Sequence, residues 1–70
     1  MTLQLNQSVN TPNGAGIYQG RMWSEGQVYA LVSHAKTAPI DFNLCQGYQG
    51  GSVWWLCTYE ISKVEAKRQN

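Results

Sequence analysis

His34, the only histidine of the chain, lies close in sequence to a serine and an aspartate. Ser33, His34 and Asp41 are residue types that can act as a nucleophile, a general base and the carboxylate that orients the base. Such a set works only when base and nucleophile are within hydrogen-bonding reach. Adjacent strand residues point to opposite faces, which separates Ser33 from His34. We therefore expect an ordinary surface or strand-end histidine, no catalytic residue and a protein that is not an enzyme.

The chain has four carboxylates, and their positions do not favour acid and base chemistry. Glu25, Asp41, Glu60 and Glu65 lie in or near predicted turns, and no spacing brings two of them together as general acid and base. No catalytic pair is predicted among them.

Two cysteines, Cys45 and Cys57, are too few and too widely spaced to predict a zinc site or a disulfide framework. Cys57 lies in an apolar run and is expected to be a small buried hydrophobe, whereas Cys45 is expected to be a loop thiol. The sequence leaves open whether the two ever pair. Gly14-Ala15-Gly16 lacks the Lys-Ser/Thr pair and the following helix of a phosphate-binding loop. No metal and no cofactor is expected.

The aromatic side chains are the better candidates for function. Each Trp or Tyr can bury about 150–250 Å², whereas a soluble monomer usually exposes an apolar patch of a few hundred Å². Aromatic and leucine side chains on outward strand faces therefore need a partner, unless the N-terminal strand or a long loop of the same chain covers them. The predicted binding or interface residues are Arg21, Trp23, Tyr29, Leu31, Tyr48, Trp54 and Leu56.

The element that must position most of them is a β-hairpin from Ile17 to Ser33. Its strand-like runs flank Ser24-Glu25-Gly26, a loop with glycine last, which is typical of a type I turn closed by a G1 bulge. This turn pairs Trp23 with Gln27. One face is then apolar and pairs Met22 with Val28, Gly20 with Ala30 and Tyr18 with Val32. The other face carries Ile17, Gln19, Arg21, Trp23, Gln27, Tyr29, Leu31 and Ser33, with Arg21 opposite Tyr29 for stacking.

The strongest strand signal is the apolar run from Val53 to Tyr59. Such a run is normally buried on both faces, but one face of a strand in so short a domain must be covered by something else. We expect Trp54, Leu56 and Thr58 to face outward. The inward set is Val53, Trp55, Cys57 and Tyr59.

The remaining segments are assigned by period and turn chemistry. Residues 1–9 predict an edge strand, residues 10–16 a loop, and residues 34–44 a long connection in which Ile40, Phe42 and Leu44 fold inward as a plug. Residues 46–52 predict a glycine-rich turn that can serve as a binding loop. Residues 61–64 favour a 3-10 turn before a short last strand, and residues 66–70 a flexible tail.

Composition predicts one domain and excludes a strong electrostatic partner. The chain has 70 residues, a formal net charge of +1 and 13% charged residues. The electrostatic field of such a chain is too weak to indicate a nucleic-acid partner. A chain of this size buries only about 60% of its unfolded surface, so association is the expected supplement to the core. We expect no signal peptide, no membrane segment and a cytoplasmic setting.

The turns and apolar positions resemble an SH3-like small barrel of the KOW or Tudor-like kind. The resemblance rests on Gly14-Ala15-Gly16-Ile17 as the entry to a central hairpin, on the Ser24-Glu25-Gly26 loop, and on residues 59–65 as the helical turn before the final strand. It implies an all-β barrel of about five antiparallel strands that recognises a ligand along its sheet or between loops. The chain also resembles in style the orphan products of phages and mobile gene cassettes.

Two functions are weighed. The first is a non-enzymatic interaction module that self-associates through its aromatic sheet face, as a homodimer or larger oligomer, and binds a further ligand such as a peptide through its loops. The alternative is a small RNA- or DNA-binding barrel that stacks bases on Trp23, Tyr29 or Tyr48. In that case Arg21, Lys36 and the basic residues of 63–68 would contact phosphates. An enzyme with a site at the pore of a symmetric oligomer is a remoter third class.

Overall fold

The computed structural model describes residues 2–67. In this part of the chain the secondary structure is six β-strands and two short 3-10 helices. In chain order these are β1 (Ser8–Thr11), β2 (Gly14–Ser24), β3 (Gln27–Ala35), η1 (Phe42–Leu44), β4 (Gly47–Gly50), β5 (Trp54–Glu60), η2 (Ile61–Lys63) and β6 (Glu65–Ala66). The predicted all-β class is confirmed, as is the 3-10 turn before the last strand.

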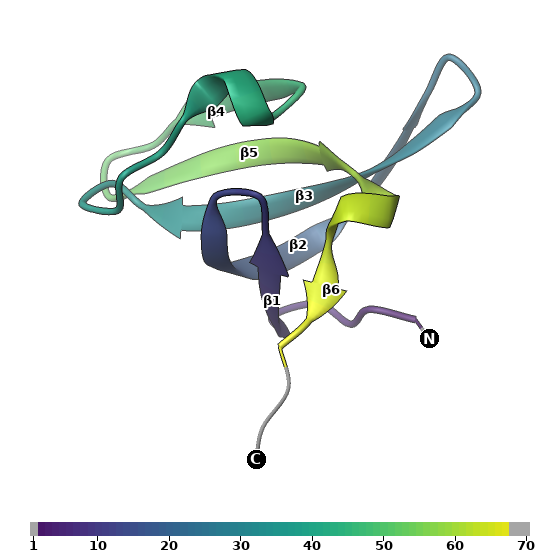
Figure 1. Cartoon of the computed structure of the whole chain (residues 1–70), viewed down its shortest axis with the longest axis horizontal. Coiled ribbons are helices and arrows are strands. Elements are labelled where there is room, and N and C mark those ends of the chain that lie inside the picture. Colours follow the sequence, from purple (N-terminus) through teal and green to yellow (C-terminus); the bar gives the residue numbers. More distant parts are fainter. Residues whose placement is uncertain (1, 68–70) are drawn as a thin grey trace.

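The strands form one antiparallel sheet with the order β4-β5-β3-β2-β1-β6. Strands β1, β2, β3 and β5 pair in succession, and β6 returns to pair with β1. Figure 1 shows β1 and β6 running across the direction of β3 and β5, so that the sheet is strongly curled. The additional strand beyond the predicted five is β4, which pairs only with β5 at one edge. Its sequence, Gly-Tyr-Gln-Gly, has the composition of a turn, and we predicted a turn there.

The central hairpin forms, but its turn is one residue shorter than predicted. Ser24 pairs with Gln27, so the loop is Glu25-Gly26, and both residues have positive φ, 52° and 79°. Positive φ at both loop residues defines a type I′ turn, whose twist matches that of the strands. The predicted pairing of Trp23 with Gln27 is therefore wrong, and Trp23 pairs with Val28.

A β-bulge restores the predicted register farther from the turn. The pairing shifts between Tyr18 and Gly20, which leaves Gln19 as an extra residue in β2, and Tyr18 pairs with Val32 as predicted. Gly20 has a φ of +126°, a conformation that other residues rarely adopt. Between the bulge and the turn, every β2 side chain lies on the face opposite to the predicted one.

Beyond the bulge the hairpin projects as a two-stranded arm. Residues 21–28 pair only within the hairpin, because the β1 partners of β2 end at Ile17 and the β5 partners of β3 end at Tyr29. In Figure 1 the arm extends away from the rest of the sheet. We refer to residues 21–28 as the hairpin arm.

The N-terminal prediction is correct only in part. A strand forms at Ser8–Thr11, which takes in two residues of the predicted loop, and pairs with the start of β2. Within the predicted strand 1–9, residues 2–7 are irregular, although Asn6 N donates to Tyr18 O at 2.9 Å and Tyr18 N to Gln7 O at 2.9 Å. Residue 1 lies outside the described range.

The predicted plug also forms in part. Ile40 packs against the core, and Phe42 is half-buried at the start of η1, but Leu44 is exposed. The predicted flexible tail 66–70 begins as strand, because Ala66 belongs to β6 and Lys67 N donates to Ser8 O at 3.0 Å. Residues 68–70 of that prediction lie outside the described residues.

The core lies inside the curl of the sheet. The predicted phase of β5 is confirmed for Trp55, Cys57 and Tyr59, which face the inward residues of β3, whereas Val53 precedes β5 and is 61% exposed. The inward pairs are His34 with Trp55, Val32 with Cys57 and Ala30 with Tyr59. The buried hydrophobic cluster consists of Val9, Tyr18, Ala30, Val32, Cys57, Tyr59 and Val64.

Candidate functional site

The side of the sheet that faces away from the core carries a largely apolar surface over four strands. The register places Ile17, Ser33, Leu56 and Gln49 in one row, and Leu31 beside Thr58 in the next. We call this surface the outer face. It comprises Ile17, Met22, Tyr29, Leu31, Ser33, Gln49, Trp54, Leu56 and Thr58, and Glu60, which pairs with Tyr29, lies at its border.

The outer face is hollowed. A depression of about 630 Å³ is lined by Ile17, Gln19, Ser33, Trp54 and Leu56 together with the β4–β5 connection. Two further depressions continue it toward the hairpin arm, along Leu31, Thr58 and Met22. A surface that is concave and apolar at its centre can accept complementary side chains.

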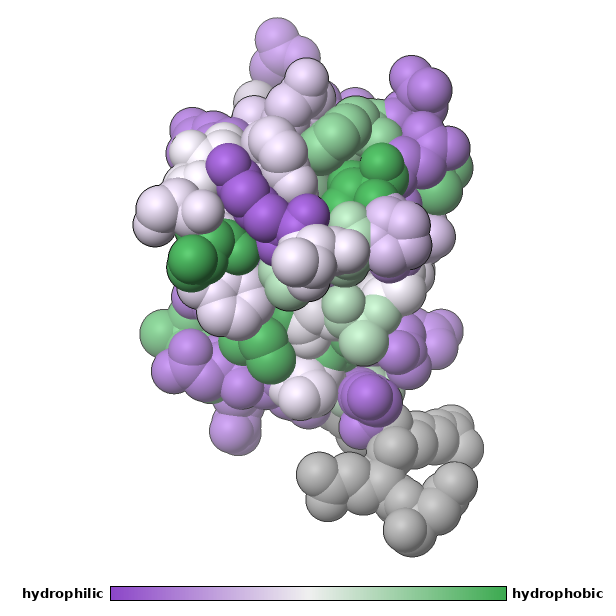
Figure 2. All heavy atoms as spheres, turned by 90° about the vertical axis from the view of Figure 1, so that its left-hand side faces the viewer, coloured by the Kyte–Doolittle hydropathy of each residue, from purple (hydrophilic) through white to green (hydrophobic). Residues whose placement is uncertain are grey.

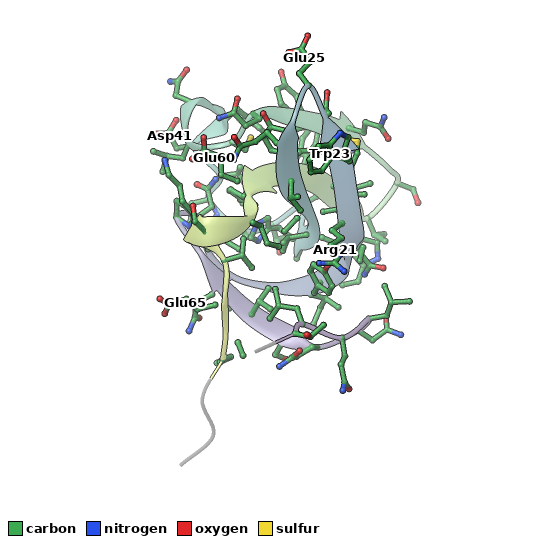
Figure 3. The ribbon with its side chains drawn as sticks, turned by 90° about the vertical axis from the view of Figure 1, so that its right-hand side faces the viewer. Arg21, Trp23, Glu25, Asp41, Glu60 and Glu65 are labelled. Atoms are coloured by element: carbon green, nitrogen blue, oxygen red, sulfur yellow. The ribbon has the colours of Figure 1, made fainter. Side chains whose placement is uncertain are left out.

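Among residues 2–67, no charged side chain lines any of these three depressions. Figure 3 shows Glu25 at the tip of the hairpin arm, and the pairing of Glu60 with Tyr29 places the Glu60 carboxylate at the border of the outer face, outside the depressions. The polar members are amides and hydroxyls, as in the bond from Gln19 Nε2 to Ser33 Oγ at 3.1 Å. Depletion of charge with aromatic enrichment is the composition of a protein interface core.

The predicted interface residues fall on two faces. Tyr29, Leu31, Trp54 and Leu56 lie together on the outer face, and Trp54 is 49% exposed. The single signal that could have placed Met22 with them is Gly20, because a glycine inside a strand pattern often marks a bulge. Ile17 belonged to the predicted face but was not selected.

Arg21 and Trp23 lie on the opposite face, which corrects the prediction. The bulge at Gln19 reverses their phase, so Arg21 pairs with Ala30 instead of Tyr29 and the predicted stacking is absent from the register. Trp23 is 69% exposed on the hairpin arm, where Figure 3 labels it beyond Arg21.

Arg21 lines a separate hollow of about 720 Å³ at the mouth of the curl. Its apolar floor is formed by Leu3, Tyr18, Ile61 and Val64. Lys67 and Glu65 also line it, so charges of both signs surround the opening and do not select one sign of ligand.

Tyr48 belongs to a third location. It pairs with Cys57 and therefore lies on the inward side of the sheet. Its ring packs on Phe42 at a centroid distance of 4.2 Å and on Trp55 at 5.9 Å. Lys36 Nζ lies 4.5 Å from the centroid of the Trp55 ring, a cation–π contact. We call Lys36, Phe42, Tyr48 and Trp55 the aromatic cluster. Figure 2 views the side of the molecule that is on the left in Figure 1, and hydrophobic groups there are interspersed with hydrophilic ones.

His34 is buried, with 1% exposure, so the expectation of a surface position is wrong, although the residue does lie near the end of β3. Its Nδ1 lies 3.0 Å from Ala15 O and its Nε2 lies 2.7 Å from Tyr59 Oη. Asn13 Nδ2 donates to Tyr59 Oη at 3.0 Å, and Asn13 Oδ1 accepts from Asp41 N at 2.8 Å. The network ties the β1–β2 turn, β3, β5 and the segment before η1 together. Both ring nitrogens of His34 are occupied by structural bonds, and Asn13 links the network to the backbone of Asp41.

Burial shifts the pKa values of this region. It lowers the pKa of His34, against the opposing effect of the bond to Ala15, and it raises the pKa of Tyr59. Burial, reinforced by the neighbouring Cys45, raises the pKa of Cys57 to about 11. These groups hold their neutral forms near pH 7, which suits a structural role.

Within residues 2–67, no group of three or more His, Cys, Asp or Glu side chains is placed to hold a metal ion. In the same range no helix has the length and apolar character needed to cross a membrane.

The chain is thus a small all-β protein with a largely apolar sheet face whose depressions have no charged lining residue among residues 2–67. Comparison with models of known families, with curated proteins and with solved structures gave no significant match. The resemblance to KOW and Tudor-like barrels accordingly stays a prediction.

Proposed function

We propose that this protein is a non-enzymatic interaction module that self-associates through its outer face, most simply as a two-fold dimer. The observation that carries the proposal is that no charged side chain of residues 2–67 lines the three depressions of that face. Hollows without charge on a largely apolar surface are complementary to a second copy of the same surface, and in a two-fold dimer the same patch serves both subunits.

The size of the molecule fits this partner. A standard interface buries about 800 Å² on each partner, which is about one sixth of the 4964 Å² accessible surface of this chain. Leu56 lies beside Ser33 in the middle strands of the outer face, and Trp54 lies beside Ala35 at the end of the face where β5 begins. Exposed tryptophans of this kind commonly anchor interfaces.

The test compares two tryptophans on opposite faces. Sedimentation over a concentration series should show wild type as a dimer, Trp54→Ala as a monomer with unchanged circular dichroism, and Trp23→Ala as a dimer. Trp23 is the matched control because it is the more exposed ring and lies outside the outer face. A wild type that is monomeric at high micromolar concentration contradicts the proposal.

A second candidate function rests on the aromatic cluster. Two residues of the nucleic-acid alternative, Tyr48 and Lys36, converge on Trp55, so an unpaired base stacked on Tyr48 would have a cation nearby for its phosphate. Arg21, Trp23 and Tyr29 lie elsewhere and do not join it. Binding of a single-stranded oligonucleotide should weaken as salt rises and should be reduced by Tyr48→Ala; salt-independent binding contradicts this role.

The finer features of the proposal follow from the same observations. An SH3-like barrel suits a meander whose last strand returns to the first. A reducing, cytoplasmic setting suits two free thiols. The further ligand at the loops would meet the aromatic cluster, which leaves the outer face free for self-association.

A further inference from the structure

The fold holds the segment that carries Cys45 alongside the part of β5 that carries Cys57. Cys57 is fully buried on the inward side of β5, and Cys45, directly after η1, is half-buried and packs against the core cluster that contains Cys57. Gln46 N donates to Thr58 O at 2.8 Å, which holds the chain at Cys45 alongside β5. Both thiols are free.

The two thiols differ in their accessibility to solvent. Cys45 is partly exposed, and its Sγ donates to Phe42 O at 3.4 Å. Burial raises the pKa of Cys57, and the neighbouring Cys45 adds to this effect, so the Cys57 thiol stays protonated at neutral pH. Thiolate character and access decide which cysteine reacts first. That residue is Cys45.

We propose that Cys45 and Cys57 form a modification site at which a peroxide produces an intramolecular disulfide. The Cys45 thiolate attacks one peroxide oxygen, the O–O bond breaks, and Cys45 becomes a sulfenic acid while hydroxide leaves. The Cys57 sulfur then attacks the Cys45 sulfur. The S–S bond forms as the S–O bond breaks, and the departing hydroxide takes the Cys57 proton. In sum, two thiols and one hydrogen peroxide give one disulfide and two waters.

The position of Cys45 permits this closure. Cys45 precedes β4 and lies outside the ladder, so it can move to satisfy the separation that a disulfide requires. The closed loop would contain β4 and its connection to β5, and would therefore tie the edge strand to the core. By restricting the unfolded chain, this bond should raise the midpoint of thermal unfolding.

The experiment treats the folded wild-type chain with a small excess of hydrogen peroxide and then measures intact mass after alkylation of the remaining thiols. We expect the loss of two hydrogens, no alkylation, the mobility of a single chain on a non-reducing gel and full reversal by dithiothreitol. Cys57→Ala should instead trap a sulfenic acid at Cys45, detected by its dimedone adduct. Cys45→Ser should leave Cys57 unmodified as long as the chain is folded.

Three results would overturn the proposal: a wild type with both thiols still free, further oxidation of Cys45 without an S–S bond, or only disulfide-linked pairs of chains. Circular dichroism establishes that each variant is folded, and the wild-type result alone is decisive if a variant is not. The mass readout does not depend on whether the chain self-associates through its outer face.

Discussion

His34 is fixed in one tautomer by its two partners. Because the carbonyl of Ala15 can only accept, Nδ1 carries the proton and Nε2 accepts from the Tyr59 hydroxyl. The Tyr59 oxygen in turn accepts from Asn13. All polar atoms of this set are satisfied in the neutral state, and a second ring proton would face the hydroxyl hydrogen of Tyr59.

This arrangement predicts acid sensitivity. The pKa of His34 lies below 6.5 in the folded chain because of burial, so the unfolded chain binds more protons once the pH falls below about 6.5. The free energy of unfolding should therefore decrease as the pH falls from about 6.5 toward the folded pKa of His34. Above about pH 6.5 the histidine should cause no loss of stability. Urea unfolding in steps from about pH 8 to about pH 5 measures this slope.

His34→Gln is the matched control, because its amide can form hydrogen bonds but does not titrate. Its stability should change less with pH than that of wild type over the same range. Equal slopes for the two proteins would show that other groups cause the acid sensitivity.

The burial of His34 could not be predicted from its own neighbourhood. The sequence shows a histidine at the end of an apolar strand, which is correct, but the hydroxyl that pairs with it is 25 residues away. The amide of Asn13, which completes the set, belongs to a turn whose position depends on the β1–β2 pairing. Contacts of this kind follow from tertiary structure and leave no local pattern.

At the scale of the elements, the backbone of β2 lies very close to β3 at Gly16. A Cβ there would lie 2.9 Å from His34 Cε1 and 2.9 Å from Ser33 O, and closer still to Val32 Cγ1. Gly16→Ala should lower the free energy of unfolding by roughly 1–3 kcal/mol through overpacking. Gly47→Ala, where a Cβ meets nothing within 4 Å, should leave it nearly unchanged. Chemical denaturation of both variants tests the pair, and equal effects would contradict the assigned contact.

The hairpin turn can be improved. Glu25 adopts a φ of 52°, a left-handed conformation that costs most residues roughly 1–2 kcal/mol but suits asparagine. Glu25→Asn should therefore stabilise the protein by roughly 0.5–1 kcal/mol, and Gly26→Ala at a φ of 79° should destabilise it. Thermal unfolding of both variants decides, and a loss of stability in Glu25→Asn would count against the turn type.

Element prediction succeeded where alternation was strong and failed where pairing decides. The hairpin, the phase of β5 and η2 follow from apolar period and turn residues. The bulge at Gln19 breaks that period without a break in composition, and it alone moves Arg21 and Trp23 off the predicted face. Strand β4 has no strand signal of its own, and its conformation comes from hydrogen bonding to β5.

For the whole molecule, the proposed self-association predicts that stability depends on protein concentration. A dimer that binds only folded chains raises the unfolding midpoint as protein concentration increases. We expect the urea midpoint of wild type to rise over a hundredfold dilution series read from low to high concentration, and that of Trp54→Ala to stay constant. A wild-type midpoint that is independent of concentration would show that the outer face has no second copy on it in solution.

The hairpin arm has a kinetic consequence. Residues 21–28 are bonded to one neighbouring strand, whereas Ala30 and Val32 are fully buried between two. The amide hydrogens of the arm can therefore exchange with solvent through local opening, whereas those at the centre of β3 exchange only when the whole chain unfolds. In a hydrogen-exchange experiment the two halves of one continuous hairpin should therefore exchange at two different rates, and the boundary between fast and slow exchange should lie at the bulge.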